Sequence, residues 1–409
     1  MKINEIYETK ILRFNNEGDG IGKVDEITTF VPYALPGELV KFKINNIYDN
    51  YATGTLLEVM EKSNCRTDVV CPYFYQCGGC NLMHMDYETQ LKFKKEKIEA
   101  IFKKVSNEII NVNKIYSNIE LNYRNKATFK VDKNKMGFYK EKTNEIIDIE
   151  KCFIVDNKIN DVLTSIRNFI NKYHDNDIGE VMIRVIDNKI MLSLDNINKD
   201  LKNIFIDKLN DIDSIYISNK LVLGEKVLVE NINDFKFNIS PKSFFQVNKK
   251  VSEKMYEKAV NYIDNSDITL DLYSGTGTIT MLLSKKSKEV IGIEVVKDAV
   301  KDANNNIKNN NISNVRFICD KVENKIEELK NLNIDNIVLD PPRSGSDKKS
   351  LKAMLEIRPK QIIYISCNPV TLARDYNILK EKYKLKEINA FDMFPNTYHV
   401  ETVMFLERK

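Results

Sequence analysis

The chain has 409 residues, of which 43% are apolar and 30% are charged, and it contains seven cysteines. This length allows about two or three domains with a sizeable core. No apolar stretch approaches the roughly 20 residues of a membrane span, and the N-terminus lacks the apolar segment of a signal peptide. We therefore expect a soluble cytoplasmic protein without a membrane partner. The net charge of +3 is too small by itself to indicate nucleic-acid binding.

Residues 1–62 alternate short β-like runs with glycine-containing turns. Roughly four to five short strands in such a segment predict a small OB-like barrel. These barrels often bind oligonucleotides. Residues 1–62 contain seven basic and ten acidic residues, so we do not expect strong electrostatic binding to an oligonucleotide. A purely structural barrel is the alternative.

Residues 63–234 have a mixed pattern that predicts a central α+β insert domain. Apolar residues at helical spacing indicate a helix over 87–105, and apolar runs indicate strands at 180–186, 189–194 and 214–218.

Basic residues are concentrated between positions 91 and 130, where ten Lys or Arg face four Asp or Glu. Within this region, Tyr123–Lys130 interleaves charged with aromatic residues, as on surfaces that contact RNA phosphates and bases. The alternative is a solvated helix face that carries Lys92, Lys94, Lys95 and Lys97.

Residues 235–409 alternate strands and helices, which is the pattern of a doubly wound parallel sheet. The expected strands are Asp267–Asp271, Glu289–Ile293, Val315–Cys319, Asn336–Asp340 and Gln361–Ile365. The predicted fold class is therefore α/β: a doubly wound, Rossmann-like domain that follows an OB-like barrel and an α+β insert.

The first of these strands ends in a glycine-rich segment, Asp271-Leu-Tyr-Ser-Gly275-Thr-Gly277. Glycines let the backbone turn tightly and approach a ligand. Glu294 follows Asp271 by 23 residues, the spacing of an acidic residue that accepts hydrogen bonds from ribose hydroxyls. Thr280 stands where a dinucleotide fold needs a third glycine. We therefore expect this segment to bind S-adenosylmethionine as the cofactor, because its positive charges suit an acidic residue. The alternatives are a nicotinamide cofactor and a sheet without a ligand.

Two later strands also end in reactive side chains. Asp340-Pro-Pro-Arg343 lacks the aromatic residue that enzymes methylating exocyclic amines place after the two prolines. One strand later, Ser366-Cys367-Asn368-Pro369 puts a thiol at the carboxyl edge of the sheet, which indicates covalent activation of a carbon. A small buried hydrophobe is the alternative interpretation of Cys367.

Carbon 5 of uracil needs such activation, because it is too weak a nucleophile to take a methyl group unaided. A thiolate that adds to carbon 6 makes carbon 5 nucleophilic, and a base must then remove the carbon-5 proton. Cys367 is the candidate nucleophile, Glu401 the candidate base, and Asp340 a candidate for hydrogen bonding to the uracil edge. The alternatives are a solvent-facing edge residue for Glu401 and a helix N-cap for Asp340. His399 is expected to have only a packing role.

The target base must leave its stack to reach this pocket, so an aromatic residue is expected beside it. The segment Ser243–Asn248 contains Phe244 and Phe245, and core packing accounts for at least one of them.

Three cysteines, Cys71, Cys77 and Cys80, lie within ten residues, with Cys152 further on and Cys65 just upstream. Disulfides are not expected in a cytoplasmic chain. Four thiolates can hold an iron–sulfur cluster or zinc, and the spacing alone does not choose between them. The C-x3-C-x2-C run of radical S-adenosylmethionine enzymes is absent.

Together these segments resemble the RNA uracil-5-methyltransferases, most closely the 23S ribosomal RNA enzymes that carry an iron–sulfur cluster. The resemblance spans the whole chain, from an N-terminal TRAM barrel and a Cys-Pro-x4-Cys-Gly-Gly-Cys insert to a methyltransferase domain. That domain contains Phe-Phe-Gln-Val-Asn, Asp-Leu-Tyr-Ser-Gly-Thr-Gly, Asp-Pro-Pro-Arg, Ser-Cys-Asn-Pro and His-Val-Glu-Thr. Because the related transfer-RNA enzymes are expected to lack the barrel and the cysteine cluster, the resemblance favours 23S ribosomal RNA as the partner.

The resemblance also implies specific site residues. A [4Fe-4S] cluster would be bound by Cys71, Cys77, Cys80 and Cys152, with the role of Cys65 left open. S-adenosylmethionine would be contacted by Gln246, Tyr273, Gly275, Glu294 and Asp340. Cys367 would be the nucleophile, Glu401 the base, Phe244 a neighbour of the flipped base, and Arg124 a substrate-placing residue. Met83 stands where the family usually has Gln.

We therefore expect a monomeric enzyme that methylates carbon 5 of a uridine in 23S ribosomal RNA. The cluster is expected to be structural, because methyl transfer from a sulfonium moves no net electron. The alternatives are a transfer-RNA uracil-5 methyltransferase and a non-catalytic RNA-binding iron–sulfur scaffold.

Overall fold

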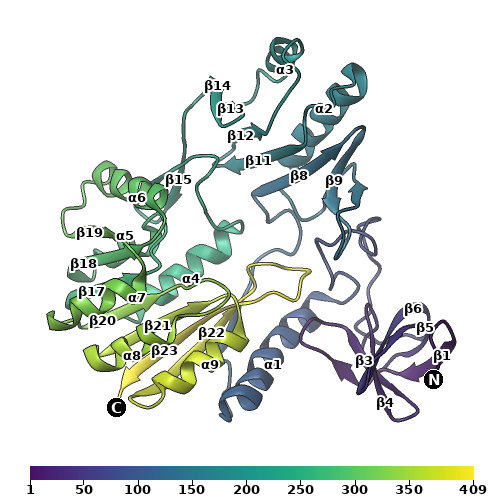
Figure 1. Cartoon of the computed structure of the whole chain (residues 1–409), viewed down its shortest axis with the longest axis horizontal. Coiled ribbons are helices and arrows are strands. Elements are labelled where there is room, and N and C mark those ends of the chain that lie inside the picture. The colour runs from purple at the N-terminus through teal and green to yellow at the C-terminus, as the bar shows by residue number, and fades with distance from the viewer. The chain divides into compact units, whose positions relative to one another are not determined.

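The computed structural model describes all 409 residues, and its contacts divide the chain into two compact units (Figure 1). The first unit comprises residues 1–97, 139–147 and 394–398, and the second comprises 98–138, 148–393 and 399–409. None of the helices combines the length and the apolar character that a membrane crossing requires.

The first unit begins with a six-stranded sheet in the order β1-β5-β6-β4-β3-β2. Its strands are β1 (Ile6–Lys10), β2 (Arg13–Phe14), β3 (Gly20–Val24), β4 (Ile27–Val31), β5 (Leu39–Ile47) and β6 (Tyr51–Glu61). Alternate residues of β5 point inward, so that Val40, Phe42 and Ile44 are fully buried in its core. Strand β3 contains Gly20 and Gly22. A side chain at either position would collide with the residues packed against that strand, so the packing requires glycine there.

Helix α1 (Tyr87–Ser106) confirms the helix predicted over 87–105. The interpretation of its lysines as a solvated face holds for exposed Lys92 but is wrong for Lys94. The Lys94 side chain is completely buried, and its ammonium group donates a hydrogen bond to the carbonyl of Phe394 (3.1 Å).

The insert contains a seven-stranded sheet in the order β10-β9-β8-β11-β12-β13-β14. Its strands are β8 (Lys126–Asp132), β9 (Lys135–Tyr139), β10 (Ile146–Asp148), β11 (Glu180–Ile186), β12 (Lys189–Leu194), β13 (Ser214–Ile217) and β14 (Lys220–Gly224). Two helices, α2 (Asn157–Tyr173) and α3 (Lys202–Lys208), contact each other through the rings of Phe169 and Phe205, whose centroids are 4.9 Å apart.

Strand β8 corrects the interpretation of the segment Tyr123–Lys130. Successive side chains of a strand point to opposite faces, and here the alternation directs Phe129 into the core, where it is fully buried. Tyr123 is 7% exposed. The aromatic residues of this basic segment therefore pack inside the domain and do not form a stacking surface.

A two-stranded hairpin and a helix connect the insert to the C-terminal sheet. They are β15 (Leu228–Ile232), β16 (Phe235–Ile239) and α4 (Lys249–Asn261). The expected boundary between residues 234 and 235 falls in the turn of this hairpin.

The C-terminal sheet has eight strands in the order β19-β18-β17-β20-β21-β23-β22-β7, which confirms the doubly wound fold. Its strands are β7 (Lys114–Tyr116), β17 (Ser266–Leu272), β18 (Ser287–Glu294), β19 (Val315–Cys319), β20 (Asn336–Leu339), β21 (Gln361–Ser366), β22 (Tyr383–Phe391) and β23 (Glu401–Arg408). Strands β17 to β21 are parallel, and β23 runs antiparallel between β21 and β22. The connecting helices are α5 (Thr278–Leu283), α6 (Lys297–Asn309), α7 (Val322–Glu328), the 3-10 helix η1 (Leu329–Asn331), α8 (Lys348–Ile357) and α9 (Pro369–Leu379).

One large apolar cluster holds this sheet together. Residues of its strands pack with α7, α8, α9 and the C-terminal half of α1, where Ile98 and Phe102 are fully buried. The chain reverses its direction of winding between β17 and β20, and open α/β sheets bind their ligands at the carboxyl edge beside such a point.

Candidate active site

The loop after β17 borders an open space at the carboxyl edge of the sheet. Tyr273, Gly275 and Gly277 have positive φ angles of 64°, 55° and 84°. A Cβ atom at Gly275 would meet no other atom within 4 Å, whereas one at Gly277 would lie 2.7 Å from the ring of Phe317. Gly277 is therefore needed for close packing, while Gly275 leaves room for a ligand.

Glu294, the last residue of β18, is tied to this loop. Its carboxylate accepts hydrogen bonds from the N–H groups of Gly275 (2.9 Å) and Val296 (2.8 Å). Val295 and Val296 are each 54% exposed, so that an apolar surface adjoins the carboxylate. This combination suits a ligand with both hydroxyl groups and an apolar ring.

Asp271 lies beneath the same loop and is 1% exposed. Its Oδ2 accepts a hydrogen bond from the hydroxyl of Thr280 (2.5 Å), so the residue at the third glycine position ties α5 to β17. Burial, together with the charges of Asp340 and Glu294, raises the pKa of Asp271 to about 7 against the lowering effect of the Thr280 hydrogen bond. Oδ1 of Asp271 and the hydroxyl of Ser274 are buried without a protein partner.

These features fit S-adenosylmethionine. Buried polar atoms without partners indicate a ligand that completes their hydrogen bonds, and carboxylates favour a ligand with positive charge. The residues that would hold it are Asp271, Ser274, Gly275 and Glu294.

Two other predicted cofactor contacts have polar partners here. The hydroxyl groups of Tyr273 and Ser346 are 3.1 Å apart, and the side chain of Gln246 is hydrogen-bonded to the hydroxyl of Tyr256. Tyr256 was not predicted from the sequence. It lies on the buried face of α4, and its pKa is raised by burial and by the nearby charges of Asp340 and Glu401. The apolar periodicity of α4 was the available signal, but it indicates only a packed helix.

Cys367 and Glu401 come together through strand register. Ser366 pairs with Thr402 in the antiparallel pair β21 and β23, so Cys367 and Glu401 are the next residues beyond that pair. Cys367 is half-buried, and Glu401 is 6% exposed in a strand that has neighbours on both sides. The alternative interpretation of Glu401 as a solvent-facing edge residue is therefore wrong.

The electrostatics of this pair are set by burial and by two further charged groups. Burial, together with the charges of Glu401 and Asp340, raises the pKa of the Cys367 thiol to about 11, and the charge of Arg343 opposes this shift. Burial and the charge of Asp340 raise the pKa of Glu401 to about 8, again against Arg343. Burial raises the pKa of Asp340 to about 6. The charges of Asp340, Glu401 and Arg343 thus all act on the thiol of Cys367.

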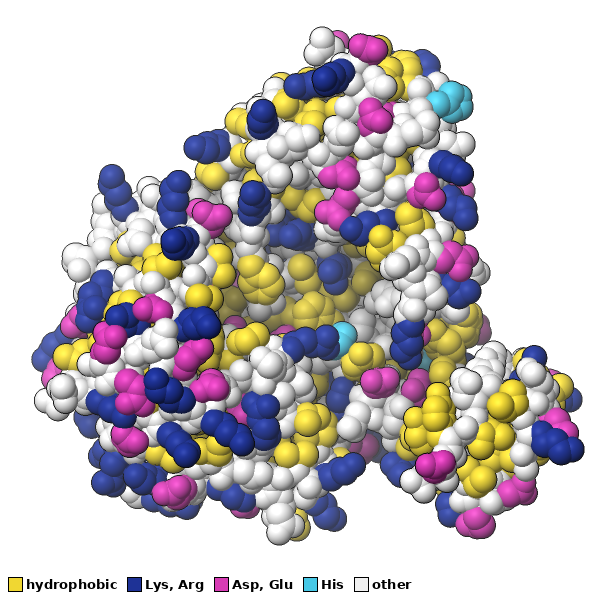
Figure 2. Space-filling model, viewed as in Figure 1, with side chains coloured by type: hydrophobic (Ala, Val, Ile, Leu, Met, Phe, Trp, Pro, Cys, Tyr) yellow, Lys and Arg dark blue, Asp and Glu magenta, His cyan; other side chains and the backbone are white.

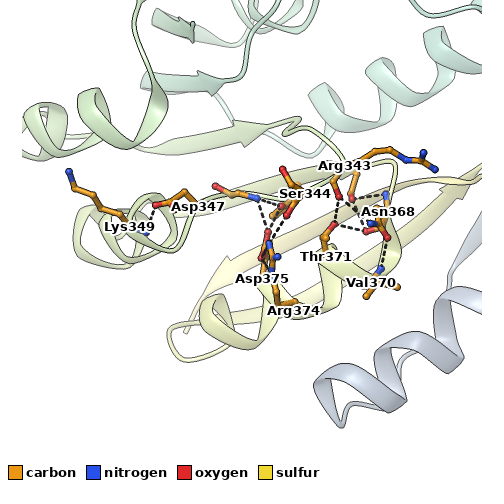
Figure 3. Close-up of polar contacts among 12 residues, drawn as sticks. Arg343, Ser344, Asp347, Lys349, Asn368, Val370, Thr371, Arg374 and Asp375 are labelled. Atoms are coloured by element: carbon orange, nitrogen blue, oxygen red, sulfur yellow. Dashed lines mark hydrogen bonds and ion pairs between the residues drawn. The ribbon is translucent and has the colours of Figure 1, made fainter. Parts of the chain in front are cut away.

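The loops after β20 and β21 are joined by the polar contacts shown in Figure 3. The carbonyl of Arg343 accepts hydrogen bonds from the side chains of Asn368 (3.1 Å) and Thr371 (3.2 Å). Asp347 caps α8, its side chain accepting from the N–H of Lys349. The alternative role of Asp340 as the N-cap of that helix is therefore wrong.

The guanidinium of Arg343 also contacts the side chain of His399. It lies 3.1 Å from Nδ1 of His399, which was expected only to pack. Arg343 therefore connects the loop after β20 to the segment that precedes Glu401.

The predicted substrate residues lie on adjoining segments. Phe244 is 74% exposed, whereas Phe245 packs on Phe237 with ring centroids 5.8 Å apart. Arg124 is half-buried, and its Nε donates to the carbonyl of Lys126 (2.9 Å). The next residue, Asn125, donates its N–H to the carbonyl of Val247 (2.9 Å), which joins the two segments.

The four cysteines that the resemblance assigns to a cluster are divided between the two units. No group of three or more His, Cys, Asp or Glu side chains is arranged to hold a metal ion. Cys71, Cys77 and Cys80 belong to the first unit and Cys152 to the second. Burial raises the pKa of both Cys71 and Cys77, and the charge of Cys71 adds to the shift at Cys77. The thiols have the donor chemistry of the expected [4Fe-4S] site, and the site itself stays a prediction.

Cys65, whose role the sequence left open, lies 3.2 Å from the hydroxyl of Ser63. It packs beside a cluster formed by Leu35, Leu82, Met85 and Phe93. Its surroundings are those of a structural residue.

Comparison with known proteins agrees with this architecture. Residues 86–409 match the family described as tRNA (Uracil-5-)-methyltransferase, and residues 2–57 match the TRAM domain. An uncharacterized RNA methyltransferase of Clostridium acetobutylicum is 37% identical over 451 residues, covering 100% of this chain and 98% of the relative. Another, from Staphylococcus aureus, is 32% identical and covers 99% of both chains.

Among solved structures, the tRNA (uracil-54, C5)-methyltransferase of Pyrococcus abyssi in complex with S-adenosyl-L-homocysteine has a TM-score of 0.82. It is 26% identical, and the match covers 98% of this chain and 99% of that one. The fold and the site therefore define an S-adenosylmethionine-dependent methyltransferase. More narrowly, the chain belongs to the RNA uracil-5-methyltransferase family, with an N-terminal TRAM domain.

The Pyrococcus structure corrects one argument made from the sequence. A transfer-RNA enzyme that matches 98% of this chain has a counterpart of its N-terminal sheet. The barrel therefore does not distinguish ribosomal RNA from transfer RNA enzymes.

Proposed function

We propose that this enzyme methylates carbon 5 of a uridine in 23S ribosomal RNA through a covalent bond between Cys367 and carbon 6. The observation that carries this proposal is the adjacency of Cys367 and Glu401 in the register of β21 and β23, in the same sheet whose strand β17 leads into the loop of Gly275. A nucleophile and a base are the two groups that the chemistry needs.

The Cys367 thiolate forms a bond to carbon 6, and the electron pair of the 5,6 double bond moves toward the oxygen on carbon 4. Carbon 5 then takes the methyl group as the sulfonium–methyl bond breaks and leaves a neutral thioether. Glu401 accepts the proton from carbon 5, the bond from Cys367 to carbon 6 breaks, and the double bond is restored.

The surrounding residues prepare these steps. When bound, S-adenosylmethionine supplies the electrophilic methyl group and a positive charge. Asp340 is proposed to accept a hydrogen bond at the uracil edge or from the cofactor, and Arg343 favours the thiolate of Cys367 by its charge. Gln246, Tyr273, Gly275 and Glu294 are proposed to contact the cofactor.

We further propose that Phe244 lies against the flipped base and that Arg124 helps to place the RNA. An aromatic side chain that is 74% exposed can cover an unstacked base, which otherwise loses its stacking energy.

The RNA class is tested directly by incubating unmodified 23S ribosomal RNA and unmodified transfer RNA, each with methyl-labelled S-adenosylmethionine. We expect label at uracil carbon 5 of the 23S RNA. Label in transfer RNA alone would assign the second candidate substrate, which the likeness to the Pyrococcus abyssi enzyme favours. Label in neither RNA would refute the proposal.

A structural [4Fe-4S] cluster on Cys71, Cys77, Cys80 and Cys152 is part of the proposal, because four thiolates are the usual ligands of such a cluster. No catalytic step passes through it. Protein purified without oxygen should be brown, with absorbance near about 400 nm from thiolate-to-iron charge transfer, and should contain iron and sulfide. Stoichiometric zinc instead would contradict the assignment. We also propose that the enzyme works as a monomer in the cytoplasm.

A further inference from the structure

The segment between β16 and α4 carries the exposed Phe244 but contains no helix or strand. It comprises residues 240–248, here named the 240–248 loop, and it lies wholly within the second unit. Because Phe244 is 74% exposed, packing of its own ring contributes little to its position. That position therefore depends on what holds the backbone on either side of it.

Arg184 holds the first part of this loop from within the insert sheet. It lies on β11 and is 2% exposed, and its guanidinium donates hydrogen bonds to the carbonyls of Ser240 (3.3 Å) and Ser243 (2.9 Å). Burial lowers the pKa of Arg184 to about 10 against the charge of Glu230, so the group stays charged at neutral pH. A buried cation is costly in free energy unless it is hydrogen-bonded. Arg184 and the loop carbonyls therefore stabilise each other.

The hydroxyl group of Ser243 ties the same part of the loop to α6. It accepts a hydrogen bond from the N–H of Ser240 (3.0 Å) and donates one to the carboxylate of Asp302 (3.1 Å). Ser243 is 4% exposed and immediately precedes Phe244. The contacts of Ser243 thus fix the point of the backbone from which Phe244 projects.

The later part of the loop is held without Arg184. The side chain of Gln246 is hydrogen-bonded to the hydroxyl of Tyr256, and Asn248 caps α4. The proposed cofactor contact through Gln246 therefore does not depend on Arg184, whereas Phe244 adjoins the part that Arg184 holds. A change at Arg184 should affect the placement of the base and leave the cofactor site intact.

We propose that Arg184 and Ser243 fix the 240–248 loop so that the ring of Phe244 covers the flipped uracil. The inference rests on the proposed function, in which Phe244 neighbours that base. Figure 2 shows the second unit hollowed between the insert and the C-terminal sheet, with apolar and basic side chains in the hollow, and an unstacked base needs such a recess. Arg184 and Ser243 are positioning residues, because both are buried and act through the loop.

The first test measures how fast the covalent adduct forms with unmodified 23S ribosomal RNA and S-adenosylmethionine in a Glu401→Gln parent, which traps it. Arg184→Met and Ser243→Ala should each slow adduct formation about 10- to 100-fold, as for a misplaced group, with unchanged affinity for S-adenosyl-L-homocysteine. Arg184→Met combined with Phe244→Ala should be no slower than the slower single change, because both remove the same contact. The control is Ile183→Val, which loosens the packing of a fully buried residue on the same strand and should keep the parent rate.

The second test needs no RNA and therefore separates the loop contacts from the proposed function. Because the chain has no tryptophan, Phe244→Trp introduces a single fluorescent reporter. The time-resolved anisotropy of the new indole ring should decay to a lower residual value with Arg184→Met or Ser243→Ala than with Ile183→Val or alone.

An unchanged anisotropy decay in both loop variants would overturn the inference. So would adduct formation at the parent rate, effects that add to that of Phe244→Ala, an equal loss with Ile183→Val, or a loss of affinity for S-adenosyl-L-homocysteine in Arg184→Met. A parent that forms no adduct with any RNA would instead refute the proposed function.

Discussion

Ser366 and Thr402 face each other at the end of the antiparallel pair β21 and β23. This single register places the thiol of Cys367 and the carboxylate of Glu401 at the same edge of the sheet, one residue beyond the pairing on each strand. A slip of one residue would turn each side chain to the opposite face. The long apolar strands therefore determine the geometry of the two groups that the proposed chemistry needs.

The two residues should fail at different steps when they are changed. Cys367→Ala should abolish turnover and adduct, because no bond to carbon 6 can form. Glu401→Gln should still form the bond but should trap it, because the amide cannot accept the carbon-5 proton. Denaturing gels of enzyme mixed with labelled RNA distinguish the two outcomes. Retained turnover by Cys367→Ala would remove the covalent route altogether.

Arg343→Met tests the electrostatic balance at the thiol. Arg343 lowers the pKa of Cys367 against burial and two carboxyl groups that raise it to about 11. Removing the guanidinium should raise that pKa further and slow alkylation of Cys367 by iodoacetamide at every pH below it, by about tenfold per unit of pKa. Peptide mass spectrometry reports the modification at this cysteine alone. Cys319, which is exposed, provides the internal control, and an unchanged rate at Cys367 would exclude the effect.

Glu401 should also make stability depend on pH. Its pKa is about 8 in the folded chain and 4.5 as the ordinary value, so the folded state binds the proton more tightly. The resulting stabilisation is fully present below about pH 4.5 and is lost as the pH rises through about 8. Because the side chain of Glu401→Gln stays neutral, the melting temperature of the variant minus that of wild type should increase by about 2 °C or more from pH 5 to pH 9. Parallel melting profiles for the two proteins would contradict this.

Lys126 should contact an RNA phosphate, because it is half-buried beside Arg124 and Arg184. Burial and these two cations lower its pKa to about 8 against the charge of Glu180, so it is charged at neutral pH. Lys126→Met should reduce the slope of log Kd against log salt by about one and weaken RNA binding about 3- to 10-fold. Lys130 provides the control, because it lies on the same strand but is ion-paired with Glu180. Equal effects of Lys126→Met and Lys130→Met would contradict the contact.

Strand ends were the most predictable part of this molecule. Cys367, Asp340 and Glu294 each close a run of apolar residues, and in a parallel sheet such ends meet at one edge. The order of the motifs along the chain therefore already indicated the site.

Contacts between distant segments were not predictable from a single sequence. Asn396 and Gln90 are 306 positions apart, and no sequence pattern around either residue predicts that the two are hydrogen-bonded. Strands β8 to β10 were also missed, because charged residues on one face hide the apolar alternation on the other. The cysteine spacing indicated a metal site, but spacing says nothing of whether Cys152 meets the other three thiols.

Two glycines of the loop after β17 should affect ligand binding and folding differently. Gly275 faces open space with a φ of 55°, whereas Gly277 has a φ of 84° and lies against Phe317 and Ala303. Gly275→Ala should weaken binding of S-adenosyl-L-homocysteine by about tenfold or more in calorimetry, because the new methyl group enters the space proposed for the cofactor. Its cost in folding free energy should stay at about 1 kcal/mol, the strain of a positive φ.

Gly277→Ala should behave differently, because its Cβ would lie 2.7 Å from the Phe317 ring. Overpacking of this kind costs about 1–3 kcal/mol in addition to the backbone strain, so the melting temperature should fall more than for Gly275→Ala. If Gly275→Ala instead bound the cofactor product as tightly as wild type, the space above Gly275 would not be the cofactor site, and the assignment of Glu294 to the ribose would lose its main support.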